Sequence, residues 1–247
     1  TIIWPMRVLI ISDIHANFVA LKTVLADAGN SFDAVWCMGD LVGYGPNPNE
    51  CVECVRTLPN LTCLTGNHDK AAINEIDITA FNLDARLAIN WTQQTITPET
   101  REYLVSRPER VLHDNYTLVH ASPRQPVWEY ILDRHTARQN FAHFNTPYCL
   151  VGHTHIPIMF LESDGDVVEC RPNYDEILAF ESERLIINPG SVGQPRDGNL
   201  DAAYAILDTD NDHWEYRRAP YDVAETQRRM AEANLPTRLI ARLQKGW

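Results

Sequence analysis

Continuous apolar runs and amphipathic segments alternate along the first half of the chain. Buried strands are predicted where the apolar residues are uninterrupted, at residues 7–12, 32–38 and 61–64. Segments with helical spacing follow them, at residues 18–28, 50–56 and 70–106. Asn17 can cap the first helix and Gly29 can end it, while Thr97 followed by Pro98 predicts a further helix start. This alternation is typical of parallel strands connected by helices.

The second half of the chain contains more short strands, separated by turn residues. These strands are predicted at residues 111–112, 116–119, 148–151, 156–161, 167–170, 184–187, 202–207 and 214–217. Hairpins are expected around the turn sequences at residues 114–115, 163–166 and 211–212. Helices are predicted at residues 135–144, 221–233 and 236–243. The whole pattern predicts an α/β fold in which two mixed sheets pack face to face with helices outside. No linker rich in Pro, Gly or Ser interrupts it, so residues 1–247 are expected to form a single domain.

Composition and charge narrow the range of functions. The chain has 247 residues, of which 45% are hydrophobic and 22% charged, as in ordinary globular proteins. Its formal net charge of -12 argues against an extended nucleic-acid surface or an anionic-membrane surface, both of which need basic patches. No stretch reaches the ~20 apolar residues of a membrane span. Residues 1–6 lack the basic region and cleavage site of a signal peptide, so a cytoplasmic enzyme is expected.

The six cysteines are expected to be reduced structural thiols. Cys37, Cys63 and Cys149 lie in apolar runs, where a free thiol packs as a small hydrophobe. Cys51 and Cys54 have a spacing found in zinc and redox sites. No second pair of comparable spacing accompanies them and the setting is not thioredoxin-like, which favours the structural role.

Five short polar motifs stand directly after apolar runs. They are Asp13-Ile14-His15, Gly39-Asp40, Gly66-Asn67-His68-Asp69, His120 in Leu118-Val119-His120-Ala121-Ser122, and Gly152-His153-Thr154-His155. Each motif alone has an ordinary structural interpretation, as a helix cap, a turn or a buried histidine. Ligands of open α/β sheets collect outside the carboxyl ends of the strands, so the five together predict one shared site.

The types of side chain in these motifs indicate a pair of metal ions. Imidazole combined with carboxylate suits divalent transition metals such as Mn, Fe, Zn, Co or Ni, and does not suit Ca. Two such ions can hold a bridging hydroxide and clamp both oxygens of an in-line displacement at phosphorus. Asp13 and Asp40 contribute the only two negative charges of the motif ligands, so two divalent ions leave a positive pocket that attracts phosphate.

The ordered set of motifs resembles the calcineurin-like metallophosphoesterase family, and in particular its small single-domain prokaryotic branch. The resemblance spans residues 7 to about 197, including the segment at 185–193. It implies a four-layer αββα sandwich. It also implies that Asp13, His15 and His155 bind one metal ion. Asn67, His120 and His153 would bind the other ion, and Asp40 would bridge the two. His68 resembles the family's catalytic histidine, which binds phosphate or protonates the leaving group without binding a metal ion.

The motif around Asp40 departs from the protein-phosphatase branch of the family. That branch reads Gly-Asp-x-x-Asp-Arg-Gly, whereas here Gly43 replaces the second Asp and Tyr44 replaces the Arg. Close similarity to protein Ser/Thr phosphatases is therefore not expected, and the group that orients His68 is not predicted. Arg124 and Arg196 are candidate replacements for the missing cation, the alternative being surface arginines paired with acids. Tyr44 could stack on a base or aryl group of the substrate, or pack on the protein.

The resulting hypothesis is hydrolysis of a small phosphate ester, by a phosphodiesterase or phosphatase whose substrate could be nucleotide-like. An alternative is a scaffold or binding protein that has kept the fold and lost activity. All eight motif positions with assigned roles are intact in this sequence, which favours the enzyme. The sequence predicts neither the native metal nor the oligomeric state.

Overall fold

The computed structural model describes residues 6–163, 165–174, 176–180 and 184–247. Within them the first sheet has six strands, in the order β3 (Thr62–Cys63), β2 (Ala34–Cys37), β1 (Arg7–Ile11), β11 (Ala202–Asp208), β12 (His213–Ala219) and β9 (Leu178–Ala179). β1, β2 and β3 are parallel, and the remaining pairs are antiparallel. The register pairs Ile11 with Cys37 and Cys37 with Cys63, so these three strands end side by side.

The second sheet also has six strands in the described part of the chain. Their order is β4 (Arg110–His113), β5 (Tyr116–Val119), β6 (Tyr148–Leu150), β10 (Arg184–Asn188), β7 (Ile158–Ser163) and β8 (Asp166–Cys170). β5, β6 and β10 are parallel, while β4, β7 and β8 join by antiparallel pairing. Leu118 pairs with Leu150, so β5 and β6 also end at the same edge.

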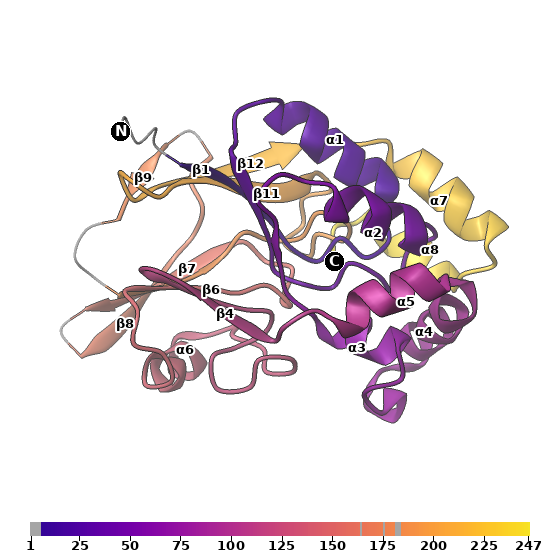
Figure 1. Ribbon diagram of the computed structural model, residues 1–247, viewed down its shortest axis with the longest axis horizontal. Coiled ribbons are helices and arrows are strands. Elements are labelled where there is room, and N and C mark those ends of the chain that lie inside the picture. Colours follow the sequence, from indigo (N-terminus) through magenta and orange to yellow (C-terminus); the bar gives the residue numbers. More distant parts are fainter. Residues whose placement is uncertain (1–5, 164, 175, 181–183) are drawn as a thin grey trace.

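Helices cover the outer faces of both sheets (Figure 1). Their bounds are α1 (Phe18–Ala28), α2 (Pro48–Arg56), α3 (Asn67–Ala72), the 3₁₀ turn η1 (Ile78–Ala80), α4 (Leu83–Thr95), α5 (Pro98–Val105), α6 (Arg134–Phe141), α7 (Val223–Glu232) and α8 (Thr237–Arg242). α1 and α2 lie on the first sheet, and α6 lies on the second. No helix in the described residues combines the length and apolar character that a membrane crossing requires.

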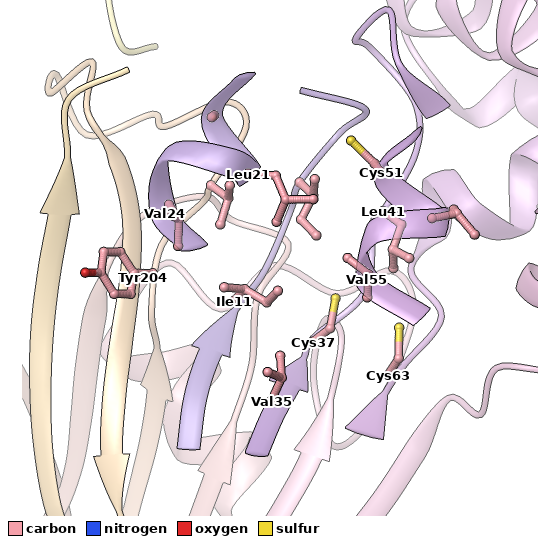
Figure 2. Close-up of a cluster of buried hydrophobic side chains, with 14 of the residues drawn as sticks. Ile11, Leu21, Val24, Val35, Cys37, Leu41, Cys51, Val55, Cys63 and Tyr204 are labelled. Carbon is pink, nitrogen blue, oxygen red and sulfur yellow. The ribbon is translucent and has the colours of Figure 1, made fainter. Parts of the chain in front are cut away.

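Both faces of β1 are buried, which explains its uninterrupted apolar sequence. Side chains alternate between the faces of a strand. Val8 and Ile10 pack between the two sheets, whereas Leu9 and Ile11 pack under α1 and α2. Figure 2 shows Ile11 beneath Leu21 of α1. The layers are therefore helices, sheet, sheet and helix, and the predicted αββα sandwich is confirmed.

All six cysteines are free thiols, in agreement with the prediction. Cys37, Cys51 and Cys63 are buried in the cluster beneath α1 and α2 (Figure 2). Cys54, the other member of the closely spaced pair, is partly buried against the same cluster. These thiols pack as small apolar groups.

The predicted strands and helices are all present, with two differences of detail. The helical stretch predicted at residues 70–106 is divided into α3, η1, α4 and α5. The divisions fall where side chains cap new starts: Asp77 accepts from Thr79 N, Asn82 from Ala85 N, and Thr97 from Thr100 N. The sequence did not reveal β9, a strand of two residues that has too few positions to form a pattern.

Two sequence predictions fall partly outside the described residues. The turn at residues 163–166 includes Asp164, and the N-terminal segment includes residues 1–5. The antiparallel pairing on either side of that turn, between β7 and β8, is confirmed. The assignment of residues 1–247 to a single domain stays a prediction.

Candidate metal centre

The five polar motifs meet at one edge of the sandwich, where strands from both sheets end. The first sheet contributes the motifs that follow β1, β2 and β3, and the second those that follow β5 and β6. Backbone hydrogen bonds hold the segments together: Asp13 N donates to Gly39 O at 3.0 Å, and Gly152 N donates to His120 O at 2.7 Å. Motifs separated by up to 140 residues therefore share a rigid frame.

Several residues of the centre have a left-handed backbone conformation, which is costly for residues other than glycine. These residues, whose φ values lie between 48° and 65°, are Asp13, His15, Asp40, Tyr44, His153 and His155. Each such conformation costs on the order of 1–2 kcal/mol. The surrounding hydrogen bonds maintain it, for example His15 N donating to Asp40 O at 2.9 Å. Strain of this kind gathers where side chains must be aimed at one point.

Metal-binding side chains cluster in overlapping groups of three. In each group the potential ligand atoms lie within 4.8 Å of one another. The first group is Asp13, His15 and His155, the second is Asp40, His120 and His153, and the third is His15, Asp40 and His68. All these residues are buried. Asn67, which begins α3, joins the second group, because its Oδ1 lies 3.2 Å from His120 Nε2.

Asp40 lies between the two main groups. Its Oδ2 is 3.6 Å from His15 Nε2 and 3.4 Å from His120 Nε2. Its Oδ1 accepts a hydrogen bond from His68 N at 2.9 Å, which fixes the direction of the carboxylate. Asp13 is off to one side, with Oδ1 at 3.3 Å from His155 Nε2. A carboxylate placed like that of Asp40 can touch cations on both sides.

Four of the histidines are tied through one ring nitrogen to a backbone carbonyl. His15 Nδ1 bonds Val42 O at 3.1 Å, and His120 Nδ1 bonds Met38 O at 2.8 Å. His155 Nδ1 bonds Gln194 O at 2.6 Å, and His153 Nε2 bonds Trp128 O at 3.2 Å. Because a carbonyl oxygen only accepts, each tied nitrogen must carry the hydrogen. The other nitrogen of each neutral ring therefore presents a lone pair, the arrangement found in metal-binding histidines.

The untied ring nitrogens of the histidines point toward one another, and the described part of the protein supplies no hydrogen-bond donor between them. His15 Nε2 and His155 Nε2 are 3.0 Å apart, although both rings carry their hydrogen on the opposite nitrogen. Two lone pairs at this distance repel unless a cation or proton lies between them. Asp13 and Asp40 add negative charge beside them. This set of imidazole and carboxylate donors fits divalent transition metal ions.

Burial keeps most of these imidazoles neutral, the form that binds metal ions. It lowers the pKa of His15 and His155 well below the usual range, and that of His153 to about 3. Burial also raises the pKa of Asp13 to about 6. His120 is the exception, because the Asp40 carboxylate outweighs the effect of burial and raises its pKa to about 9. A divalent ion beside His120 would reverse this local preference.

His68 differs from the four tied histidines. Its Nδ1 is buried and has no hydrogen-bond partner within the described residues. Aromatic rings hold it instead, with the Tyr44 ring centre at 4.3 Å and the Phe81 and His15 ring centres at 5.0 and 4.8 Å. Burial lowers the pKa of His68 to about 4. Ring packing therefore orients His68 where the protein phosphatases would use a second Asp.

Gly43, which occupies the position of that second Asp, leaves space for the His68 ring. A Cβ atom at Gly43 would lie 2.5 Å from His68 Nδ1. The residue also has a φ of +85°, in the left-handed region. An aspartate side chain could not be added here without displacing His68.

Replacing Gly43 with alanine should lower the turnover of a phosphate ester by about tenfold to 10²-fold, because small misplacements of a catalytic group have effects of that size. Turnover of an aryl phosphate ester measures this. Gly165→Ala is the matched control, since Gly165 also has a positive φ of +79° but a Cβ there meets nothing within 4 Å. Equal activity of the two variants would show that the position of His68 does not depend on Gly43.

The three candidate substrate contacts lie in different settings. Tyr44 is buried, and its ring centre is 4.6 Å from that of His15. The Arg196 guanidinium is 5.8 Å from the Tyr44 ring centre, and the Arg196 backbone N–H donates to His155 O. Its Nη2 donates to the amide of Gln194, and no carboxylate within the described residues forms an ion pair with it. Arg124, in contrast, forms an ion pair with Glu129 and also bonds Gln139.

Aromatic residues beside the centre were missed by the sequence analysis. Tyr130 stacks on His153 with ring centres 4.0 Å apart, and Trp128 packs on Phe81 at 5.1 Å. Tyr130 is 47% exposed and Trp128 is 36% exposed, so both offer ring surface to a ligand. They lie in the loop after His120, which contains no repeated pattern or recognisable motif. Only its density of aromatic residues could have drawn attention to it.

Comparisons with known proteins agree with this architecture. A family model described as the calcineurin-like phosphoesterase superfamily domain matches residues 6–212. A crystal structure of a metallophosphoesterase from Sphaerobacter thermophilus is 48% identical, with a TM-score of 0.91, and covers 99% of this chain and 100% of that one. An uncharacterised protein of Methanocaldococcus jannaschii is 37% identical over 96% of this chain and 97% of its own length. The chain therefore belongs to the calcineurin-like phosphoesterase superfamily.

A more distant relative has a named activity. The symmetrical bis(5'-nucleosyl)-tetraphosphatase of Vibrio parahaemolyticus is 28% identical over 141 residues, which is 54% of this chain and 51% of that protein. The family and these relatives support phosphoesterase activity in general.

Proposed function

We propose that the protein hydrolyses small phosphate esters with the help of two divalent transition metal ions. The observation that carries this proposal is the set of four buried histidines, each tied to a carbonyl by one nitrogen and offering the other to a shared centre. In a cluster with a purely structural role, we would not expect every histidine to leave one ring nitrogen without a protein donor. Asp40 between the two groups supports a pair of ions and not a single one.

The proposed ligands fall into two sets. Asp13, His15 and His155 would hold one ion, and Asn67, His120 and His153 would hold the second. Asp40 would contact both. When bound, the two ions would polarise the phosphate as Lewis acids and would lower the pKa of a water molecule, so that hydroxide is available as the nucleophile near neutral pH.

The protein's own residues orient the ester and manage the proton. His68 is proposed to bind a phosphate oxygen or to protonate the leaving oxygen, because it is held in place without being tied to a carbonyl. Proton donation requires that the negative charge of the bound phosphate raise the pKa of His68 from its value of about 4. Arg196 is the proposed cation for the remaining phosphate charge, since it lies by Tyr44 and has no paired acid in the described residues. Arg124 is less suited to this role, because its guanidinium already forms an ion pair with Glu129.

The exposed rings at the centre suit a substrate with an aromatic group. Tyr130 and Trp128 offer flat surface next to His153 and Phe81, where a base or aryl group could stack. Phosphodiesterase action on a nucleotide-like substrate is therefore proposed ahead of simple phosphate monoester hydrolysis. The similarity to bis(5'-nucleosyl)-tetraphosphatases points in the same direction.

A substrate panel with controlled metal content tests this function. Protein stripped of metal should be inactive, and Mn, Co, Ni or Zn should restore hydrolysis of an aryl phosphodiester, an aryl phosphomonoester or diadenosine tetraphosphate. We expect the diester or the dinucleotide to have the highest kcat/KM. If no metal raises the rate on any of the three, the alternative of an inactive scaffold protein would be favoured.

A further inference from the structure

A cavity of about 630 Å³ lies between α4 and the C-terminal end of the chain. Its walls come from residues 82–84 at the start of α4 and from residues 238–247 in and after α8. Volumes of this size are typical of small-molecule sites. α4 and α8 share one hydrophobic cluster, which fixes the two walls relative to each other (Figure 1).

The cavity is positively charged although the protein is acidic. Arg238, Arg242 and Lys245 line it, against the single carboxylate of Asp84. Asp84 is 3.7 Å from Arg238 Nε, and Arg242 Nε donates to Trp247 O. Among the described residues, no Asp or Glu side chain forms an ion pair with Arg242 or Lys245. In a chain of net charge -12, three cations beside one side-chain carboxylate favour an anionic ligand.

The wall of the cavity at residues 82–84 lies next to the metal centre, because it directly follows Phe81, whose ring centre is 5.0 Å from that of His68. Leu239 and Leu243 of the α8 region pack with Tyr44, and Leu243 also borders a small space lined by Tyr44 and His15. The loop that follows Arg196 is tied to the same region, because Gly198 N donates to Gly246 O at 2.8 Å. Burial and then the nearby charge of Arg196 lower the pKa of Arg242, as expected for cations in one electrostatic field.

An aromatic ring stands at the edge of the cavity. Trp247 is 62% exposed, and the Lys245 ammonium is 5.1 Å from its ring centre. Arg242 Nε donates to Trp247 O at 2.7 Å, which holds the residue against the cationic wall. A ligand with phosphates and a flat base would match both features.

We propose that this cavity binds the distal phosphates and base of a nucleoside polyphosphate whose other end lies at the metal centre. The inference rests on the proposed function, since it extends the same active site. Arg238, Arg242 and Lys245 would bind the distal phosphates and so favour long substrates over short ones, and Trp247 would stack on the base. A short ester would reach the metal centre alone, and a long one would occupy both sites.

The kinetic test uses the double variant Arg238→Gln/Lys245→Gln, which removes two exposed cations. Its KM for diadenosine tetraphosphate should rise about tenfold, equivalent to about 1.4 kcal/mol, with kcat within twofold. Its KM for an aryl phosphodiester should not change, because that substrate does not reach the cavity. The matched control is Arg134→Gln/Arg138→Gln, which removes two cations from α6 on the second sheet and should change neither KM.

A binding test separates this inference from the proposed function. Calorimetry with metal-free protein should detect diadenosine tetraphosphate, with about tenfold weaker binding to Arg238→Gln/Lys245→Gln. Trp247→Ala should weaken binding of diadenosine tetraphosphate but not of inorganic tripolyphosphate. Equal binding by wild type, double variant and control would overturn the inference. Absence of hydrolysis of the aryl diester by metal-loaded wild type would instead contradict the proposed function, and the binding data would still decide on the cavity.

Discussion

Replacing Asp40 with asparagine should lower phosphate-ester hydrolysis by about 10³-fold or more, because loss of even one charge-stabilising group typically costs about 10²–10³-fold. The Asp40 carboxylate lies between His15 and His120, so its charge would serve both proposed ions. Asparagine keeps an oxygen that can accept from His68 N, and it tolerates the left-handed φ of 53°. The fold should therefore survive while the second ion is lost or loosened. Turnover of an aryl phosphodiester and the metal content of the same sample measure the two effects.

Asp33→Asn is the matched control for this substitution. Asp33 comes just before the start of β2, whereas Asp40 follows its end. The Asp33 side chain is exposed and accepts a hydrogen bond from Arg7 N. Its replacement should leave hydrolysis within about twofold, as for most exposed sites. If Asp40→Asn retained wild-type turnover in a folded protein, Asp40 would not be a shared ligand and the dinuclear assignment would be wrong.

Replacing His68 with glutamine should lower kcat by about 10²–10⁴-fold, the usual contribution of a positioned acid or base. Metal content should stay unchanged, since His68 belongs to neither proposed ligand set. If His68 protonates the leaving oxygen, the loss should be larger for a poor leaving group than for an acidic phenol. Turnover on a pair of aryl esters that differ in phenol acidity, with metal analysis alongside, provides the measurement.

The geometry also offers a competing role for His68. Its ring nitrogen is close enough to His15 and Asp40 to complete a third group of potential ligands. Loss of one metal ion in His68→Gln would show that His68 is a ligand, and would refute the catalytic role. His135→Gln, an exposed histidine on α6 that bonds Gln139, is a suitable control and should retain activity.

Strand position made much of the fold and the site readable from the sequence. The apolar run before Asp13 is continuous because both faces of β1 are buried, and the same holds for β2 before Asp40. Parallel strands in register end together, so polar residues placed just after them are brought close without further information. The predicted metal ligands and His68 gather for this reason.

The remaining features depend on contacts between distant segments, which one sequence does not encode locally. The carbonyls that tie the histidines belong to Val42, Met38, Trp128 and Gln194, and any residue type supplies a carbonyl. The ring packing of His68 depends on Phe81, in a segment without a motif. The cationic cavity joins α4 to the C-terminal end of the chain, more than 150 residues apart in numbering. The packing of whole helices and strands determines these features, and the hydrophobic periodicity of the sequence does not reveal that packing.

The most direct test is to locate metal ions by anomalous diffraction in crystals of manganese-loaded protein. Two ions per chain are expected, about 3.5–4 Å apart, with Asp40 in contact with both. His15 and His155 should contact one ion, and His120 and His153 the other, while His68 contacts neither. A single ion, or an ion held by His68, in protein that hydrolyses a phosphodiester at its full rate would contradict the account.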